Sequence, residues 1–357
     1  MHFSAKVRKH RLQFYFSAGT SRGILHFKDS WFLKLEAAGR CGVGEAGPLA
    51  GLSPEGTELD ALWPQVLKNM DSGGIPKTIE EVYQLAAGAA EGVASIQFAL
   101  ETAMLDWLLG GEKKLFNNSF SSGASCISIN GLIWMADKGT MKSRIDEKLN
   151  EGFSCLKLKI GAIDFKEELS LLAYIRSLYP AEELVIRVDA NGAFSPAEAP
   201  TKLSQLAEWD LHSIEQPIRQ GQYIAMQQLC RQSPIAVALD EELIGMTTTL
   251  QKQELLDKLQ PPYIILKPSL LGGLAATGEW IKLAEERGIG WWITSALESN
   301  IGLNAIAQFT AQFSPELPQG LGTGKLYTNN LPSPLEVENG FLCYRQDAAW
   351  DLSLLGW

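Results

Sequence analysis

No stretch of this sequence approaches the roughly 18 consecutive apolar residues that a membrane-spanning helix requires. The opening residues, MHFSAKVRKHRLQFYF, alternate polar and apolar side chains and lack the continuous apolar segment of a secretory signal peptide. We therefore expect a cytoplasmic protein without a membrane partner.

Clustered positive charge is also lacking. The chain has 31 Lys and Arg residues against 41 Asp and Glu residues, and its formal net charge is −10. Nucleic acids bind proteins through grouped cations that displace counterions, so this balance argues against a nucleic-acid partner. A small anionic substrate remains compatible with it if a few cations or a metal ion line the pocket. The sequence leaves the oligomeric state open.

Cysteine is sparse, and its spacing matches no metal-binding or redox motif. None of the five cysteines belongs to a Cys-x-x-Cys pair or has a histidine at a zinc-binding distance. This pattern predicts reduced cysteines that pack in a reducing compartment. They are Cys41, Cys126, Cys155, Cys230 and Cys343.

The rest of the composition is that of a large globular protein, with 46% apolar and 20% charged residues. Residues 3–47 alternate as strands with Gly-rich turns between them, which predicts a small antiparallel sheet. Residues 64–110 carry helical periodicity, and a polar linker rich in Gly and Ser follows. The length favours one barrel-type domain with a smaller second domain.

After the linker, short apolar runs alternate with helical stretches, and a charged residue ends five successive runs. These residues are separated by 30, 26, 25 and 27 positions, which is the length of one strand, one helix and two short loops. The repeat predicts a parallel (β/α) barrel, in which all five charges point to the mouth at the carboxyl ends of the strands. The five are Lys159, Asp189, Glu215, Asp240 and Lys267.

The first of these runs, CLKLKIG, contains two lysines two residues apart. Side chains alternate along a strand, so Lys157 and Lys159 lie on the same face. A strand with one solvated face would show the same pattern. The charges on the four following strands favour a catalytic mouth instead.

Three carboxylates that converge on one point repel each other unless a cation lies between them. The oxygen donors of Asp189, Glu215 and Asp240 suit Mg²⁺, with Mn²⁺ as a possible substitute, and the absence of thiolate or imidazole disfavours zinc. A salt-bridged cluster, in which the lysines neutralise the acids, is the alternative. A lysine beside a second ammonium and a metal ion would have a lowered pKa, which suits it to remove a proton next to a carboxylate.

The segments KLKIG, RVDANGAF, IEQP, ALDEEL and ILKPSLLGG resemble, in this order and at this spacing, the muconate-lactonising branch of the enolase superfamily. The resemblance implies an α/β fold, a (β/α)7β TIM-like barrel with an α+β capping domain. It divides the chain into a capping domain at 1–121, the barrel at 122–324 and a C-terminal segment at 325–357 that returns to the cap.

Further segments, including GEAGPLAGLSPE, INGLIWM and SALESNIGL, are similar to members of this branch that act in menaquinone synthesis. The implied activity is dehydration of 2-succinyl-6-hydroxy-2,4-cyclohexadiene-1-carboxylate to 2-succinylbenzoate, a lyase reaction. By motif match, Lys159 is the base and then the acid, Lys267 is the cation that faces the intermediate, and Lys157 assists electrostatically.

The same motif match makes Asp189, Glu215 and Asp240 the metal ligands. Asn191 and Glu241 would support these ligands through hydrogen bonds. The polar loops supply candidate substrate contacts, which are Ser21, Arg22, Ser295, Glu298, Ser299 and Asn300.

Two other functions stay open. An N-acylamino acid racemase or dipeptide epimerase would use both lysines as acid and base, although the segment GLGTGKLY lacks the acidic residues typical of dipeptide epimerases. A catalytically silent barrel that serves as a binding module would be expected to have lost one of the strand-end charges, and none is lost.

Overall fold

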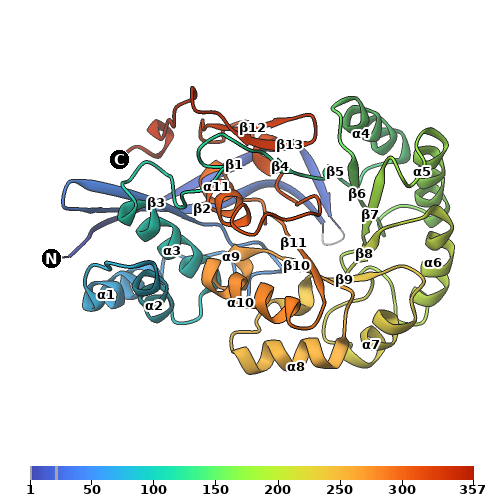
Figure 1. The fold of residues 1–357 in the computed structure, drawn as a ribbon, viewed down its shortest axis with the longest axis horizontal. Coiled ribbons are helices and arrows are strands. Elements are labelled where there is room, and N and C mark those ends of the chain that lie inside the picture. Colours follow the sequence, from blue (N-terminus) through green and yellow to red (C-terminus); the bar gives the residue numbers. More distant parts are fainter. Residues whose placement is uncertain (1, 21–22) are drawn as a thin grey trace.

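The structure is a computed structural model that describes residues 2–20 and 23–357 (Figure 1). Its N-terminal part is a three-stranded antiparallel sheet in the order β1-β2-β3. The strands are β1 (Ser4–Thr20), β2 (Gly23–Ala37) and β3 (Arg40–Ala46). The antiparallel sheet expected at residues 3–47 is therefore confirmed.

Three helices follow this sheet: α1 (Trp63–Gly73), α2 (Ile79–Ala90) and α3 (Ala94–Leu108). Helix α3 packs directly on β3 because two glycines leave room for its backbone. A Cβ atom at Gly42 or Gly44 would lie 2.0 Å from a carbonyl oxygen of α3. Larger residues would push the helix off the sheet.

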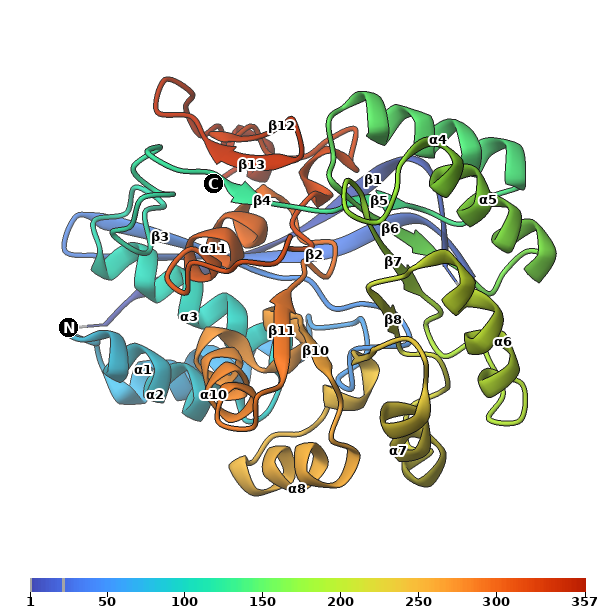
Figure 2. The same ribbon diagram turned by 45° about the vertical axis from the view of Figure 1, so that its right-hand side comes forward.

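The second sheet has seven parallel strands in the order β11-β10-β9-β8-β7-β6-β5. They are β5 (Gly131–Ile133), β6 (Cys155–Lys159), β7 (Val185–Asp189), β8 (Ser213–Glu215), β9 (Val237–Leu239), β10 (Tyr263–Leu266) and β11 (Gly290–Ile293). The helices between successive strands lie on the outside of this curved sheet (Figures 1 and 2). They are α4 (Lys138–Asn150), α5 (Phe165–Leu178), α6 (Ala199–Leu206), α7 (Tyr223–Gln232), α8 (Thr249–Leu259), α9 (Pro268–Leu271) and α10 (Gly273–Glu285), and α11 (Asn300–Thr310) follows β11.

The two edges of the parallel sheet are linked by residues 319–320. Gln319 forms a parallel bridge to Ile129, and Gly320 forms one to Thr294. The sheet therefore curves round so that the carboxyl ends of its strands face one region.

The C-terminal part forms a small antiparallel sheet and then packs on the N-terminal sheet. This small sheet has the order β12-β13-β4, with β4 (Ile127–Ser128), β12 (Leu335–Glu338) and β13 (Phe341–Tyr344). Beyond it, Leu355 packs in a cluster with Phe32 of β2 and Val43 of β3.

The expectation of five reduced cysteines was wrong for two of them. Cys126, just before β4, forms a disulfide with Cys343 of β13, and their Cα atoms are 4.5 Å apart. Pairing of β4 with β13 brings together two cysteines that are 217 residues apart, a contact that spacing alone does not indicate. Cys41, Cys155 and Cys230 are free thiols.

Within residues 2–20 and 23–357, no helix combines the length and the apolar character needed to cross a membrane.

Candidate active site

The two lysines of β6 are buried. Lys157 has 5% of its surface exposed and Lys159 has 9%, and all five residues of the strand are buried. A strand with one solvated face does not fit these values. Burial of two ammonium groups requires compensating charge nearby.

The register of the parallel strands supplies that charge. Lys159 lies beside Asp189 on β7, and Asp189 lies beside Glu215 on β8. Asp240 follows β9 directly and Lys267 follows β10. The five strand-end charges predicted from the repeat therefore lie side by side in the sheet.

The lysines bridge the carboxylates. The Nζ atom of Lys157 lies 3.1 Å from Asp189 Oδ2 and is also hydrogen-bonded to Glu215. On the other side, Lys267 Nζ is hydrogen-bonded to Asp240 and lies 3.7 Å from Glu215 Oε1. Positive charge therefore lies between each pair of neighbouring acids.

Lys159 has two partners of its own. Its Nζ atom donates to Asp189 Oδ2 at 3.0 Å and to Asn191 Oδ1 at 2.7 Å. Asn191 also donates its backbone N–H to Asp189 Oδ1 at 3.0 Å and its side-chain amide to Glu241 at 3.3 Å. Asn191 adopts a left-handed conformation with φ of 44°, which asparagine tolerates well. Asn191 thus joins Asp189 to Glu241, and the expected support of metal ligands by Asn191 and Glu241 stays a prediction.

The pKa values of the cluster follow from burial and these ion pairs. Burial alone lowers the pKa of Lys157, but Asp189 and Glu215 outweigh it and leave that pKa above its ordinary value. The pKa of Lys267 is raised in the same way, mainly by Asp240 against burial. Burial raises the pKa of Asp189, but the three lysines outweigh it and hold that pKa below its usual range.

For the other two acids burial prevails, and the pKa values of Glu215 and Asp240 are raised. In this arrangement the pKa values of Lys157 and Lys267 are raised, whereas the expected lowering concerns a lysine beside a bound metal ion and stays a prediction. The raised values arise because each ammonium touches a carboxylate directly.

The carboxylate oxygens of the cluster suit a hard cation, although lysine ammonium groups contact them in this structure. Within the described part of the chain, no three acidic, histidine or cysteine side chains converge closely enough to hold a metal ion. The oxygens of Asp189, Glu215 and Asp240 are all buried, and Glu215 Oε1 accepts no hydrogen bond from any described residue. A buried carboxylate oxygen without a hydrogen-bond donor is available as a ligand to a cation.

A cavity of about 180 Å³ opens above the cluster. Polar groups occupy its floor, and apolar residues from the N-terminal sheet, the following loop and β5 make up much of its wall. The polar lining includes Lys157, Lys159, Asp189, Asn191 and Lys267, and the apolar lining includes Ile24, Leu25, Leu49, Leu52, Leu132, Trp134 and Leu297. A mostly apolar pocket with a few convergent charges is typical of a small-molecule site.

The candidate substrate contacts divide into three groups. Ser295 lines the cavity. Glu298, Ser299 and Asn300 are absent from its described lining and instead make hydrogen bonds within the protein, which differs from their assignment as substrate-facing residues. Ser21 and Arg22 lie outside the described residues, so their role stays a prediction.

Sequence reasoning missed several lining residues. Asn130, Trp134 and Thr323 face the cavity, and the ring of Trp134 is 5.8 Å from Lys159 Nζ. Asn130 and Trp134 belong to the segment INGLIWM, in which their alternation along a short strand was the available signal.

Comparison with known proteins identifies the family. The model of the family described as enolase C-terminal domain-like matches residues 140–347, more than half of the chain. This chain belongs to the enolase superfamily. The resemblance drawn from the five strand-end motifs is confirmed.

One relative in this superfamily is similar over nearly the whole length. A protein of Desulfotalea psychrophila named o-succinylbenzoate synthase is 51% identical over 358 residues, which cover 94% of this chain and 97% of the relative. The crystal structure of MenC from Desulfotalea psychrophila LSv54 covers 96% of this chain and 100% of its own, with a TM-score of 0.83 and 45% identity.

More distant superfamily members share the fold. The dipeptide epimerase of Enterococcus faecalis V583, solved with Mg and the dipeptide L-Leu-L-Tyr, gives a TM-score of 0.80 at 20% identity and covers 98% of both chains. At this identity the similarity concerns the fold alone.

Proposed function

We propose that this chain is an o-succinylbenzoate synthase. It dehydrates 2-succinyl-6-hydroxy-2,4-cyclohexadiene-1-carboxylate to 2-succinylbenzoate, a step of menaquinone synthesis. The observation that carries the proposal is the 51% identity to a protein of that name, together with a cavity that exposes Lys159 and Lys267.

In this mechanism Lys159, as the neutral amine, takes the proton on the carbon next to the substrate carboxylate. The C–H electrons move toward that carboxylate, and the resulting enediolate faces the ammonium of Lys267. Lys159 then returns the proton to the departing hydroxyl. The C–O bond breaks, water leaves, the ring becomes aromatic, and Lys159 is again neutral.

Asp189, Glu215 and Asp240 are the proposed ligands of Mg²⁺, and Mn²⁺ is a proposed substitute. The bound cation would supply a fixed positive charge for the substrate carboxylate. Asn191 and Glu241 would hold the ligand carboxylates in place through their hydrogen bonds. Lys157 contributes positive charge beside Asp189 and Glu215.

We also propose how the chain divides into a barrel and a cap. Residues 122–324 form a closed (β/α)7β barrel, which the bridges of residues 319–320 support. Residues 1–121 form the cap, and residues 325–357 return to it. We place the protein in the cytoplasm, where the proposed pathway intermediate would be produced.

An ultraviolet assay for the aromatic product tests the function directly. We expect turnover with Mg²⁺, loss of turnover in chelator and recovery on adding Mg²⁺ back. The circular dichroism spectrum should stay unchanged in chelator, because the core of the parallel sheet consists of apolar strand residues. Absence of turnover at all Mg²⁺ concentrations would refute the proposed function, and full turnover in chelator would refute the metal.

Epimerisation of an N-acylamino acid or dipeptide is the second candidate. It is favoured by one observation, that Lys159 and Lys267 line the same cavity and could serve opposite faces of a substrate. Incubation with such substrates in D₂O separates the two candidates. Deuterium uptake without any dehydration activity would favour the epimerase.

A further inference from the structure

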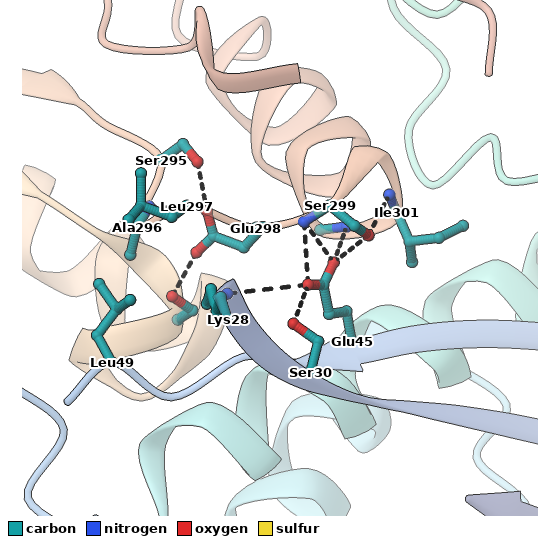
Figure 3. Close-up of polar contacts among 12 residues, drawn as sticks. Lys28, Ser30, Glu45, Leu49, Ser295, Ala296, Leu297, Glu298, Ser299 and Ile301 are labelled. Carbon is teal, nitrogen blue, oxygen red and sulfur yellow. Dashed lines mark hydrogen bonds and ion pairs between the residues drawn. The ribbon is translucent and has the colours of Figure 1, made fainter. Parts of the chain in front are cut away.

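A buried network joins the N-terminal sheet to one wall of the cavity (Figure 3). On the sheet side, Glu45 of β3 accepts hydrogen bonds from Ser30 Oγ at 2.8 Å and from Ser299 Oγ at 2.5 Å. The backbone nitrogens of Ser299 and Gly302 also donate to Glu45, each at 3.0 Å. Glu45 therefore caps the N-terminus of α11, where the backbone N–H groups have no partner within the helix.

Glu298 forms a second set of hydrogen bonds nearer the cavity. Its carboxylate accepts from Ser295 Oγ at 2.5 Å and from the backbone nitrogen of Ala296 at 2.7 Å, and Ser269 Oγ donates to the other oxygen at 2.5 Å. Ser295 in turn accepts from Thr323 Oγ1 at 2.8 Å. Ser295, Ala296 and Thr323 line the cavity, so Glu298 fixes part of its wall from behind.

Lys28 of β2 is the cation of this network. It is 5% exposed, and its Nζ atom lies 3.9 Å from Glu45 Oε1. Among the described residues this ammonium has no hydrogen-bond partner. Burial lowers the pKa of Lys28, and the charges of Glu45 and Glu298 oppose that shift.

The chain makes room for this ammonium at a specific point. A Cβ atom at Gly47 would lie 2.3 Å from Lys28 Nζ and 3.1 Å from Ser30 Oγ. Both carboxylates are already occupied by hydroxyl and N–H donors, so Lys28 acts on them through its charge. Two buried carboxylates without that charge would be costly to hold side by side.

We propose that Lys28 is a positioning residue for the cavity: its buried charge holds Glu45 and Glu298 in place, and these two fix residues 295–302 as the wall beside the substrate. Lys28 is absent from the described lining of the cavity. The contact of β2 with residues 295–302 thereby forms part of the wall of the binding site. The kinetic part of this inference rests on the proposed function, and its structural part does not.

Lys28→Met tests the inference because methionine keeps the length of the side chain and removes the charge. We expect KM to rise about tenfold with kcat changed less than about threefold, since the wall moves while the proton-transfer groups stay. Amide hydrogen exchange should accelerate at Ser299 and Gly302. Lys252→Met is the matched control, because Lys252 is also a buried lysine, ion-paired to Glu279 on the outer helices α8 and α10. It should leave KM and exchange at residues 299–302 unchanged.

One further variant separates charge from packing. Gly47→Ala keeps every charge and displaces the ammonium, and it should raise KM in the same direction.

Unchanged KM and unchanged exchange in Lys28→Met would overturn the inference. If Lys28→Met does not fold, an unchanged KM in Gly47→Ala overturns it. An inactive wild-type protein refutes the proposed function instead, and exchange at residues 299–302 then still decides the role of Lys28.

Discussion

Glu101 of α3 accepts a hydrogen bond from the backbone nitrogen of Leu274, the second residue of α10, at 2.5 Å. The backbone nitrogen of Ala275 donates to the same oxygen at 3.3 Å. Like Glu45 at α11, Glu101 is a glutamate from the N-terminal half that caps a helix following one of the parallel strands. Its carboxylate fits because residue 273 is glycine: a Cβ atom there would lie 2.3 Å from Glu101 Oε2.

This relationship predicts a pH-dependent stability. Burial raises the pKa of Glu101 to about 8, and the hydrogen bonds from Gln97, Leu274 and Ala275 only partly oppose it. Between the unfolded-state pKa and about 8, the folded state holds a proton that the unfolded state has released. The contribution of Glu101 to the free energy of unfolding therefore falls by up to about 1.4 kcal/mol per pH unit as pH rises through this window, and levels off above it.

Glu101→Gln should remove this part of the slope, because glutamine still accepts from Leu274 and cannot ionise. The measurement is urea unfolding at several pH values between 5 and 9, about the width of the window. Glu80→Gln, at the exposed start of α2, is the control and should leave the slope as in the wild type. Equal slopes in the wild type and Glu101→Gln would show that Glu101 does not titrate in this range.

Much of the fold and the acidic cluster could be predicted from the sequence, because both depend on the regular repeat of strand and helix along the chain. Each βα unit has nearly constant length, so a charge at the same point of successive units must face the same end of the sheet. Lys159, Asp189 and Glu215 are adjacent for this reason alone. The N-terminal sheet could also be predicted, because polar and apolar residues alternate along residues 3–47.

What escaped prediction depends on contacts between distant segments. Glu298 lies in a polar loop beside the cavity, and the sequence does not show that its carboxylate turns inward to Ser269 and Ser295. The raised pKa of Lys267 depends on its distance to Asp240, which the period of the repeat does not determine. The pairing of Cys126 with Cys343 depends on the register of β13 against β4.

The disulfide should stabilise the protein without affecting catalysis. Cys126 and Cys343 lie outside the described lining of the cavity, and the cross-link closes a loop across a separation of 217 residues. The double variant Cys126→Ser and Cys343→Ser should lose about 2–4 kcal/mol in free energy of unfolding, because its unfolded chain is less constrained. Its kcat and KM should match the wild type.

Thiol titration in denaturant checks the disulfide bond itself. We expect three free thiols before reduction and five after it. Five free thiols before reduction would contradict the pairing.

Lys267→Ala should be severely impaired in the proposed dehydration. The ammonium of Lys267 lines the cavity and is the cation proposed to face the enediolate, so its loss removes stabilisation that is needed only when charge develops. We expect kcat to fall by about 10²- to 10³-fold, the loss typical of removing one such group. KM should change much less. A loss confined to KM would instead make Lys267 a substrate-binding group.

Lys159 and Lys157 share one face of β6, yet their surroundings predict unequal roles. Lys159 is at the carboxyl end of the strand and donates hydrogen bonds to Asp189 and Asn191. Lys157 lies one layer deeper and bridges Asp189 to Glu215. Lys159→Ala should reduce kcat by about 10²- to 10⁴-fold, as expected when a base that also serves as the acid is removed. Lys157→Ala should be less impaired in turnover and should bind Mg²⁺ more tightly, since two buried acids lose the ammonium that competes with the metal ion for them. Turnover and Mg²⁺ titration of both variants decide between these roles. Near-normal turnover in Lys159→Ala beside an inactive Lys157→Ala would exchange the two assignments, because the base must be the lysine whose removal stops proton transfer.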